Sequence, residues 1–222
     1  MMVINRMMIT LKVNRTIKRC AFALFALLTS SSALASDVLV EAESFQNKGG
    51  WSVDQQFIDQ IGSPYLIAHG LGKKVNDAQT NIEIKDKAKY YVYVRTYNWT
   101  APWCKTAGPG KFLISINNKK LNAILGSTGD KWMWQYAGEL SLPAGKASLK
   151  LHDLTGFDGR CDAIFLTTTP TTPPNSLKEL SGFRLKHNPT LQKEPAKKQF
   201  DLVVVGGGVA GMSAALSAAR LG

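Results

Sequence analysis

The sequence predicts a mainly β protein: an antiparallel, jelly-roll-like β-sandwich, then a linker, then the first strand–helix unit of a truncated Rossmann-type domain. Three observations lead to this prediction. Residues 36–169 contain about eight short strand-like runs separated by Gly, Pro and Asn, with no convincing helix between them. Residues 170–199 are rich in proline and lysine. Residues 200–222 join an apolar β-branched run to a glycine-rich turn and an alanine-rich segment.

The first 35 residues have the pattern of a secretory signal peptide. Basic residues up to Arg19 precede an apolar run over 21–28, and Ala33-Leu34-Ala35 forms a small-x-small cleavage motif. The apolar run is too short for a stop-transfer helix, so an uncleaved anchor is the less favoured alternative. We expect export to the periplasm, cell surface or exterior after cleavage near Ala35, and no membrane span in the mature chain.

The formal net charge of +11 is unevenly distributed along the chain. Residues 1–35 carry five basic residues and no acidic one, and residues 173–200 carry six basic and two acidic residues. Little net charge therefore remains for the predicted sandwich. A nucleic-acid-binding protein needs its positive charge on one face of a fold, so this distribution argues against that class.

The strand predictions rest on alternation and on turn residues. Val92 and Val94 should face one side of a strand, and Tyr91 and Tyr93 the other. Asn117-Asn118 suits a turn that needs left-handed backbone geometry. The predicted runs lie at 38–45, 65–68, 81–84, 90–99, 112–116, 140–142, 149–151 and 162–168. In the linker, 176–186 is expected to form a short helix that docks through Leu177, Leu180 and Phe183.

Aromatic residues are the first candidate for ligand binding. Trp99, Trp132 and Trp134 belong to a set that includes Trp103 and Tyr136. Flat rings stack on the apolar faces of sugars, which makes a polysaccharide the expected partner. Aromatic rings also fill sandwich cores, and we favour that interpretation for the set.

Acidic and histidine residues offer two more candidates. Glu41 and Glu43 would share a strand face and, with Asp162, could hold calcium through carboxylate oxygens; a solvated strand edge is the favoured alternative. His152 beside Asp153 or Asp158 suggests acid–base chemistry. No nucleophile is paired with this histidine in the sequence, so we favour a structured loop.

Two cysteines remain after export, Cys104 and Cys161. The expected compartment permits a disulfide. The sequence does not decide between a bond and two separate thiols. It lacks a histidine cluster at ligand spacing that would indicate a zinc site.

The C-terminal segment carries a GxGxxG motif between a predicted buried strand (201–205) and a predicted helix. Gly206 would permit the tight turn, Gly208 the approach of a pyrophosphate, and Gly211 close packing of the helix on the strand. The helix N-terminus would attract the phosphates.

Two resemblances follow from these residues. The Val40-Glu41-Ala42-Glu43 strand, the strand ending at Trp99, the Trp132/Trp134 segment and the stretch 153–164 together resemble the golvesin/xanthan-lyase-type carbohydrate-binding-like sandwich. The resemblance implies a non-catalytic accessory domain.

Residues 200–222 resemble the amino-terminal fingerprint of FAD-dependent oxidoreductases, whose phosphate-loop glycines match Gly206, Gly208 and Gly211. The combination implies the N-terminal part of an exported flavoenzyme that acts on a small redox substrate. The second strand and its ribose-binding acid are absent, so we expect this chain alone to be inactive and not to hold FAD stably. A secreted carbohydrate-binding module is the main alternative, and a relative of the polysaccharide (xanthan) lyases is a weaker one.

Overall fold

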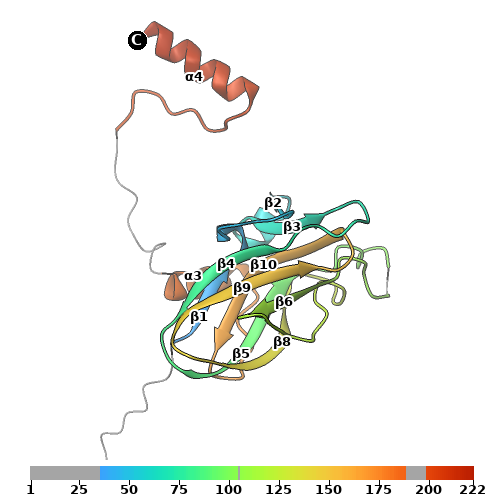
Figure 1. The fold of residues 1–222 in the computed structure, drawn as a ribbon. Helices are drawn as coiled ribbons and strands as arrows, with labels where there is room; N and C mark the ends of the chain where they lie inside the picture. The colour runs from blue at the N-terminus through green and yellow to red at the C-terminus, as the bar shows by residue number, and fades with distance from the viewer. Residues whose placement is uncertain (1–35, 105, 189–198) are drawn as a thin grey trace, which may run out of the picture.

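A computed structural model describes residues 36–104, 106–188 and 199–222. The predicted signal peptide therefore lies outside the described residues. Residues 36–169 form an antiparallel two-sheet sandwich, as the sequence predicts (Figure 1). Its six-stranded sheet has the order β2-β3-β10-β5-β8, with β1 also paired to β10. Its strands are β1 (Val38–Glu41), β2 (Ser52–Asp54), β3 (Tyr65–His69), β5 (Ala88–Thr96), β8 (Met133–Leu142) and β10 (Phe157–Thr167).

The second sheet has four strands in the order β4-β9-β6-β7. The predicted turn at Asn117-Asn118 joins β6 to β7, and both residues have positive φ, of 50° and 61°. Apolar side chains from both sheets form the main core, in which Val92 and Val94 of β5 are fully buried. The strands are β4 (Ala78–Ile84), β6 (Phe112–Ile116), β7 (Lys119–Lys120) and β9 (Gly145–Asp153).

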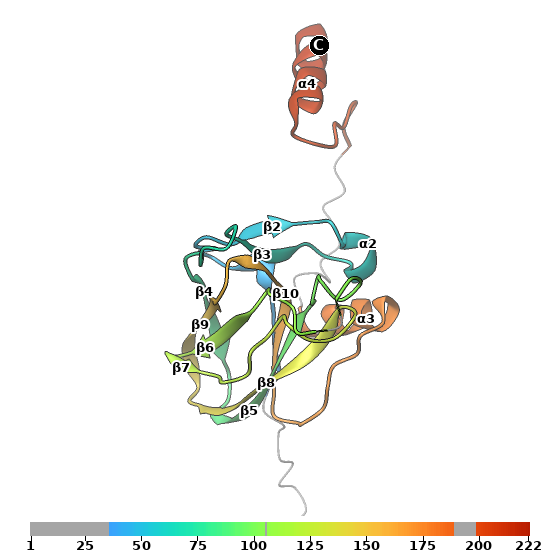
Figure 2. The same ribbon diagram turned by 90° about the vertical axis from the view of Figure 1, so that its right-hand side faces the viewer.

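Two helices cover the other face of the six-stranded sheet. They are α2 (Ile58–Ile61) and α3 (Leu177–His187), and Figure 2 shows both on the side away from the four-stranded sheet. The Ser176 hydroxyl caps α3 by accepting from the amide of Glu179. Leu180 is buried in a cluster with Trp134 and Phe165, and Phe183 packs against it. This confirms the expected helix, although Leu177 is largely exposed.

The strand predictions need several corrections. The first strand ends at Glu41, and Ala42–Ser44 form a 3-10 turn (η1). Glu41 and Glu43 therefore do not share a strand face. The short helix α2 lies within residues 36–169, where no helix was expected, and the sequence did not predict β2 or β7. Such two- to four-residue elements depend on their neighbours more than on their own sequence.

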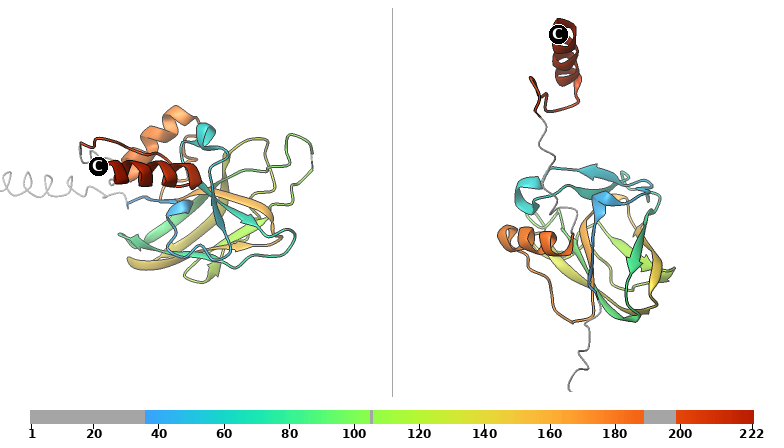
Figure 3. Two further views of the ribbon diagram at one scale, coloured as in Figure 1. Left: turned by 90° about the horizontal axis from the view of Figure 1, so that it is seen from above. Right: turned by 90° about the vertical axis from the view of Figure 1, so that its left-hand side faces the viewer.

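The C-terminal segment stands apart from the sandwich (Figures 1 and 3). Helix α4 (Val209–Leu221) follows Gly208, as predicted, and contains no buried residue. The strand expected at 201–205 is not formed. A parallel strand needs a neighbouring strand to satisfy its backbone groups, and none of the described strands pairs with this segment. Among the described helices, none has the length and apolar character to cross a bilayer.

Candidate functional site

Three connections meet at one end of the sandwich: the loop from β5 to β6, the loop from β7 to β8, and the turn before β10. Hydrogen bonds tie them together. The amide of Gly108 donates to the carbonyl of Ser127, at 2.7 Å. The Thr155 hydroxyl donates to the carbonyl of Pro109, at 2.6 Å, and Trp99 Nε1 donates to the carbonyl of Phe157, at 3.1 Å. These cross-links fix the position of the half-buried Trp99 ring.

A pocket of about 370 Å³ opens beside this end, which we call the edge pocket. Strands β2, β3 and β10 contribute its walls, and its polar side chains include both acids and bases. His69 Nδ1 lies 2.6 Å from Asp158 Oδ1 at the rim. The lining residues are Ser52, Val53, Asp54, Gln56, Ile67, His69, Asp158 and Arg160.

Arg160 is the central cation of the edge pocket. Only 6% of the residue is exposed, and its guanidinium carbon lies 5.7 Å from the Trp99 ring centroid and 6.0 Å from that of Phe57. Nη1 donates to the carbonyl of Asp158 at 3.0 Å, while Nε is buried without a hydrogen-bond partner. A buried donor of this kind costs free energy unless a ligand or water meets it.

The two acids of the edge pocket are both positioned by hydrogen bonds. Burial alone would raise the pKa of Asp54, but bonds from the Tyr65 hydroxyl and the amides of Gln55 and Gln56 outweigh it and hold the pKa below its ordinary value. Asp158 has a φ of 59°, a left-handed conformation that aspartate tolerates better than most residues. The pocket thus offers charged acceptors and donors beside an aromatic ring.

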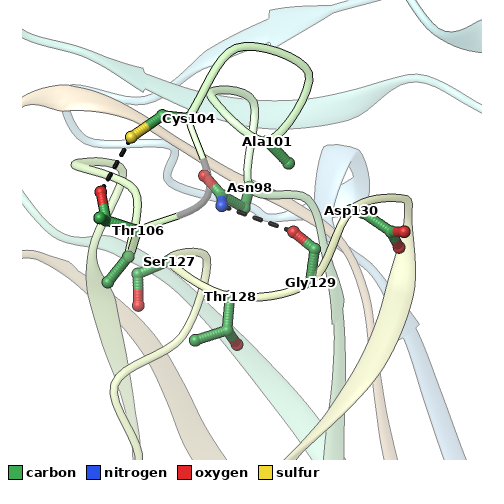
Figure 4. A pocket seen from close by; sticks show the side chains of 9 residues that line it. Asn98, Ala101, Cys104, Thr106, Ser127, Thr128, Gly129 and Asp130 are labelled. Carbon is green, nitrogen blue, oxygen red and sulfur yellow. Dashed lines mark hydrogen bonds between the residues drawn. The ribbon is translucent and has the colours of Figure 1, made fainter.

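A second pocket, of about 400 Å³, lies between the two long loops, and we call it the loop pocket (Figure 4). Asn98 Nδ2 donates across it to the carbonyl of Gly129, at 3.4 Å. A hydrogen bond with the Thr106 hydroxyl, at 2.8 Å, lowers the pKa of the exposed Cys104 thiol. Trp103 precedes the pocket-lining Cys104 in the sequence, and 78% of it is exposed.

The structure separates the three candidate tryptophans. Trp132 and Trp134 are 4% and 5% exposed, on the outer face of the six-stranded sheet. Trp132 packs among Tyr65 and Tyr97 beneath α2, and Trp134 lies against Phe183 of α3. Trp132 and Trp134 therefore have the packing role that we favoured for the aromatic set, because other aromatic side chains cover their rings. Trp99, in contrast, is half-buried, and its ring lies 5.7 Å from the guanidinium carbon of Arg160, which lines the edge pocket.

The three calcium candidates do come together, but around an arginine. Arg184 Nε donates to Glu41 Oε1 at 2.9 Å, and Nη2 donates to both carboxylate oxygens of Asp162, each at 2.9 Å. Burial, with the charges of Glu41 and Asp162, raises the pKa of Glu43 to about 8. Within the described residues, no group of three potential ligands is arranged to hold a metal, so these oxygens do not fit a calcium ion as they stand.

His152 has partners that the sequence did not reveal. Its Nε2 lies 2.7 Å from the Ser115 hydroxyl, and its Nδ1 lies 2.8 Å from Asp77 Oδ2. The order of the groups resembles that of a serine hydrolase. However, Ser115 is 2% exposed, and it sits mid-strand, where the sheet ladders engage the backbone amides that would form an oxyanion hole.

The remaining candidates are also placed. Asp153 is buried, and its carboxylate accepts from the amides of Val75, Thr155 and Gly156, which supports the interpretation of a structured loop. Cys104 is exposed, Cys161 is buried, and both are free. Burial raises the pKa of the Cys161 thiol.

The glycine motif has a specific local geometry. Gly206 has a φ of 109°, which favours glycine. A Cβ at Gly211 would lie 2.0 Å from the carbonyl oxygen of Gly206, so the turn requires glycine there too. Gly208 is the N-cap of α4.

Sequence reasoning missed His69, Asp54 and Arg184. Each has at least one side-chain partner that is more than ten positions away in the sequence, so no local pattern marked them. Arg184 and Glu41, for example, are 143 positions apart.

Comparison with known proteins gives a fold likeness without a family. No family model matches the chain, and no curated protein does. It is similar to a GH26-CBM35 β-(1,4)-mannanase from Podospora anserina (20% identity, 63% of this chain and 29% of that chain, TM-score 0.48). It is also similar to a family 35 carbohydrate-binding module from Clostridium thermocellum (16%, 61% and 100%, 0.47). A third similar structure is the C-terminal CBM6 of the laminarinase LamC from Zobellia galactanivorans (14%, 60% and 99%, 0.41). Each of these TM-scores is below 0.5 and each identity is below 25%, so the similarities assign neither a family nor a ligand to this chain.

Proposed function

We propose that the sandwich is a non-catalytic carbohydrate-binding module whose ligand site is the edge pocket together with the Trp99 ring. The observation that carries the proposal is Arg160. Its guanidinium carbon lies 5.7 Å and 6.0 Å from the Trp99 and Phe57 ring centroids, the nearly buried residue lines an open pocket, and its Nε has no hydrogen-bond partner.

The chemistry of the edge pocket suits a polyhydroxylated ligand. Sugar hydroxyls donate to carboxylates such as Asp54 and Asp158, and they accept from guanidinium and imidazole groups such as Arg160 and His69. The Trp99 ring supplies an apolar surface next to these groups, where a sugar ring stacks through its C–H face. With two acids set against Arg160 and the His69 side chain, the lining favours neutral sugars over uronates, because an added carboxylate would meet Asp54 and Asp158.

Glycan-array binding of the full chain, followed by calorimetry on the best ligand, tests this proposal. We expect Trp99→Ala to weaken binding by about fivefold, since one lost aromatic contact is worth about 1 kcal/mol. Tyr136→Ala is the matched control, because Tyr136 is half exposed on β8 and lines neither pocket. The absence of any glycan binding, or equal losses in both variants, would overturn the proposal.

We propose, as a second function, that residues 200–222 belong to a dinucleotide-binding unit of an exported FAD-dependent oxidoreductase. The close approach of Gly211 to the Gly206 carbonyl favours it, because this packing places free amides at the start of α4 where phosphates bind. Gly206, Gly208 and Gly211 would hold the pyrophosphate. The DNA after codon 222 tests this: we expect an open frame continuing into a strand that ends in Glu or Asp, and an immediate stop codon would contradict it.

A further inference from the structure

The carboxylates of Glu41 and Asp162 converge beneath α3, and a guanidinium lies between them. Arg184 donates to one oxygen of Glu41, to both oxygens of Asp162 and, through Nη1, to the carbonyl of Ile61. These acceptors come from β1, β10 and the end of α2, which are remote in sequence. One side chain of α3 therefore closes a polar site built by three other elements.

The oxygens around Arg184 are those that a hard cation would use. Asp162 and Glu41 supply four carboxylate oxygens and Ile61 one carbonyl oxygen, and Glu43 adds its own carboxylate nearby. Glu41 Oε2 and Glu43 Oε2 are both buried with no hydrogen-bond partner. Calcium takes six to eight oxygen ligands of these kinds, so the acceptor set exceeds what one guanidinium engages.

We propose that Arg184 stands in for a divalent cation at this site, so that helix α3, rather than a metal, neutralises Glu41 and Asp162. A metal and α3 would then compete for the same oxygens. The native chain is expected to be indifferent to calcium, and removal of the guanidinium is expected to create a calcium site.

The packing of α3 explains how the guanidinium is held in place. Leu180 lies one helical turn before Arg184 and is buried against Trp134 and Phe165, so the two side chains share the face that meets the sheet. Arg95 also contacts Asp162, with Nη1 at 2.8 Å from Oδ2. It balances part of the negative charge and remains when Arg184 is removed.

Thermal unfolding of the full chain in EDTA and in millimolar CaCl₂ tests the proposal. We expect the native Tm to be the same in both. Arg184→Gln should lower the Tm in EDTA, and calcium should then raise it by several degrees, because a ligand that binds only the folded state stabilises it. Lys178→Gln, an exposed change on the same helix, should behave as the native chain does.

A second variant identifies the ligands. Adding Glu43→Gln to Arg184→Gln should abolish or greatly reduce the calcium response. A calcium-dependent rise in the native Tm would overturn the proposal, as would a folded Arg184→Gln protein with no calcium response. If Arg184→Gln is unfolded in EDTA, recovery of the native tryptophan emission on adding calcium supports the proposal, and failure to recover in calcium overturns it.

Discussion

Arg160 and Arg184 are both buried, with 6% and 7% of each residue exposed, yet their surroundings differ. Every guanidinium nitrogen of Arg184 donates to an oxygen, and two carboxylates balance its charge. Arg160 has a carbonyl acceptor for Nη1, two aromatic rings close to its guanidinium, and an Nε without a hydrogen-bond partner. Both arginines line pockets, Arg160 the edge pocket and Arg184 a pocket beside α3, so the difference between them lies in their hydrogen bonds.

The difference separates two uses of a buried charge. A fully hydrogen-bonded ion pair fixes how α3 sits on the sheet, and breaking it leaves charges stranded in a low-dielectric interior. An arginine that lines a pocket and has an unmet donor keeps part of its hydrogen-bonding capacity unused. We therefore assign Arg184 to the architecture and Arg160 to recognition.

The largest expected effect comes from Asp162→Asn. Both Arg95 and Arg184 would lose their shared carboxylate, and one broken buried ion pair costs about 3–5 kcal/mol. Urea denaturation of the full chain measures the free energy of unfolding, with the exposed Asp130→Asn as the control. A loss below about 1 kcal/mol would contradict a structural role for the cluster around Arg184.

The pH dependence of the melting temperature tests the same cluster of acids around Arg184, with a smaller expected effect. Burial raises the pKa of Glu43 from an unfolded value near 4.5 to about 8. The folded state therefore binds the proton more tightly, and this contribution is complete below pH 4.5 and is lost as the pH rises through about 8.

We expect the Tm of the native chain to fall between pH 5 and pH 8 more steeply than that of Glu43→Gln, which keeps a neutral side chain throughout. Parallel melting curves at each pH measure the difference. Identical slopes in the two proteins would show that the Glu43 carboxyl is not held in its protonated form.

Arg160→Gln tests whether Arg160 contributes mainly to sugar binding and Arg184 mainly to stability. We expect a loss of stability of about 1–2 kcal/mol, from one hydrogen bond and two ring contacts, well below that of Asp162→Asn. Sugar affinity should fall at least tenfold, measured by calorimetry on the best ligand from the glycan array. Arg184→Lys, which keeps the cation, is the comparison: it should lose stability and retain the affinity. The reverse pattern would exchange the two roles.

The sequence predicted the sandwich because its signals are local. Alternation in β5 placed Val92 and Val94 in the core, and the paired asparagines marked the turn after β6. The spacing of Leu180 and Phe183 predicted the helix that became α3.

The sites were less predictable because their residues are distant in sequence. The edge pocket joins Asp54, His69 and Arg160 from three strands. Glu41 and Asp162, two of the acids considered for calcium, both bind Arg184 of α3, and this cation could not be inferred from their spacing. Residues 201–205 have the local pattern of a strand but do not form one, because none of the described strands pairs with them.

The smallest expected effect concerns Ser115, which extends the comparison to a third polar group. Its hydroxyl, His152 and Asp77 form a hydrogen-bonded chain with the connectivity of a hydrolase, but all three are paired and Ser115 is covered. By the reasoning applied to Arg184, a paired and covered group is structural. We expect Ser115→Ala to cost about 0.5–1.5 kcal/mol and the native chain to resist labelling by a serine-reactive fluorophosphonate. Covalent labelling of Ser115, traced by mass spectrometry and lost in His152→Gln, would show that a covered and fully paired group still performs chemistry, and would break the distinction drawn between the two arginines.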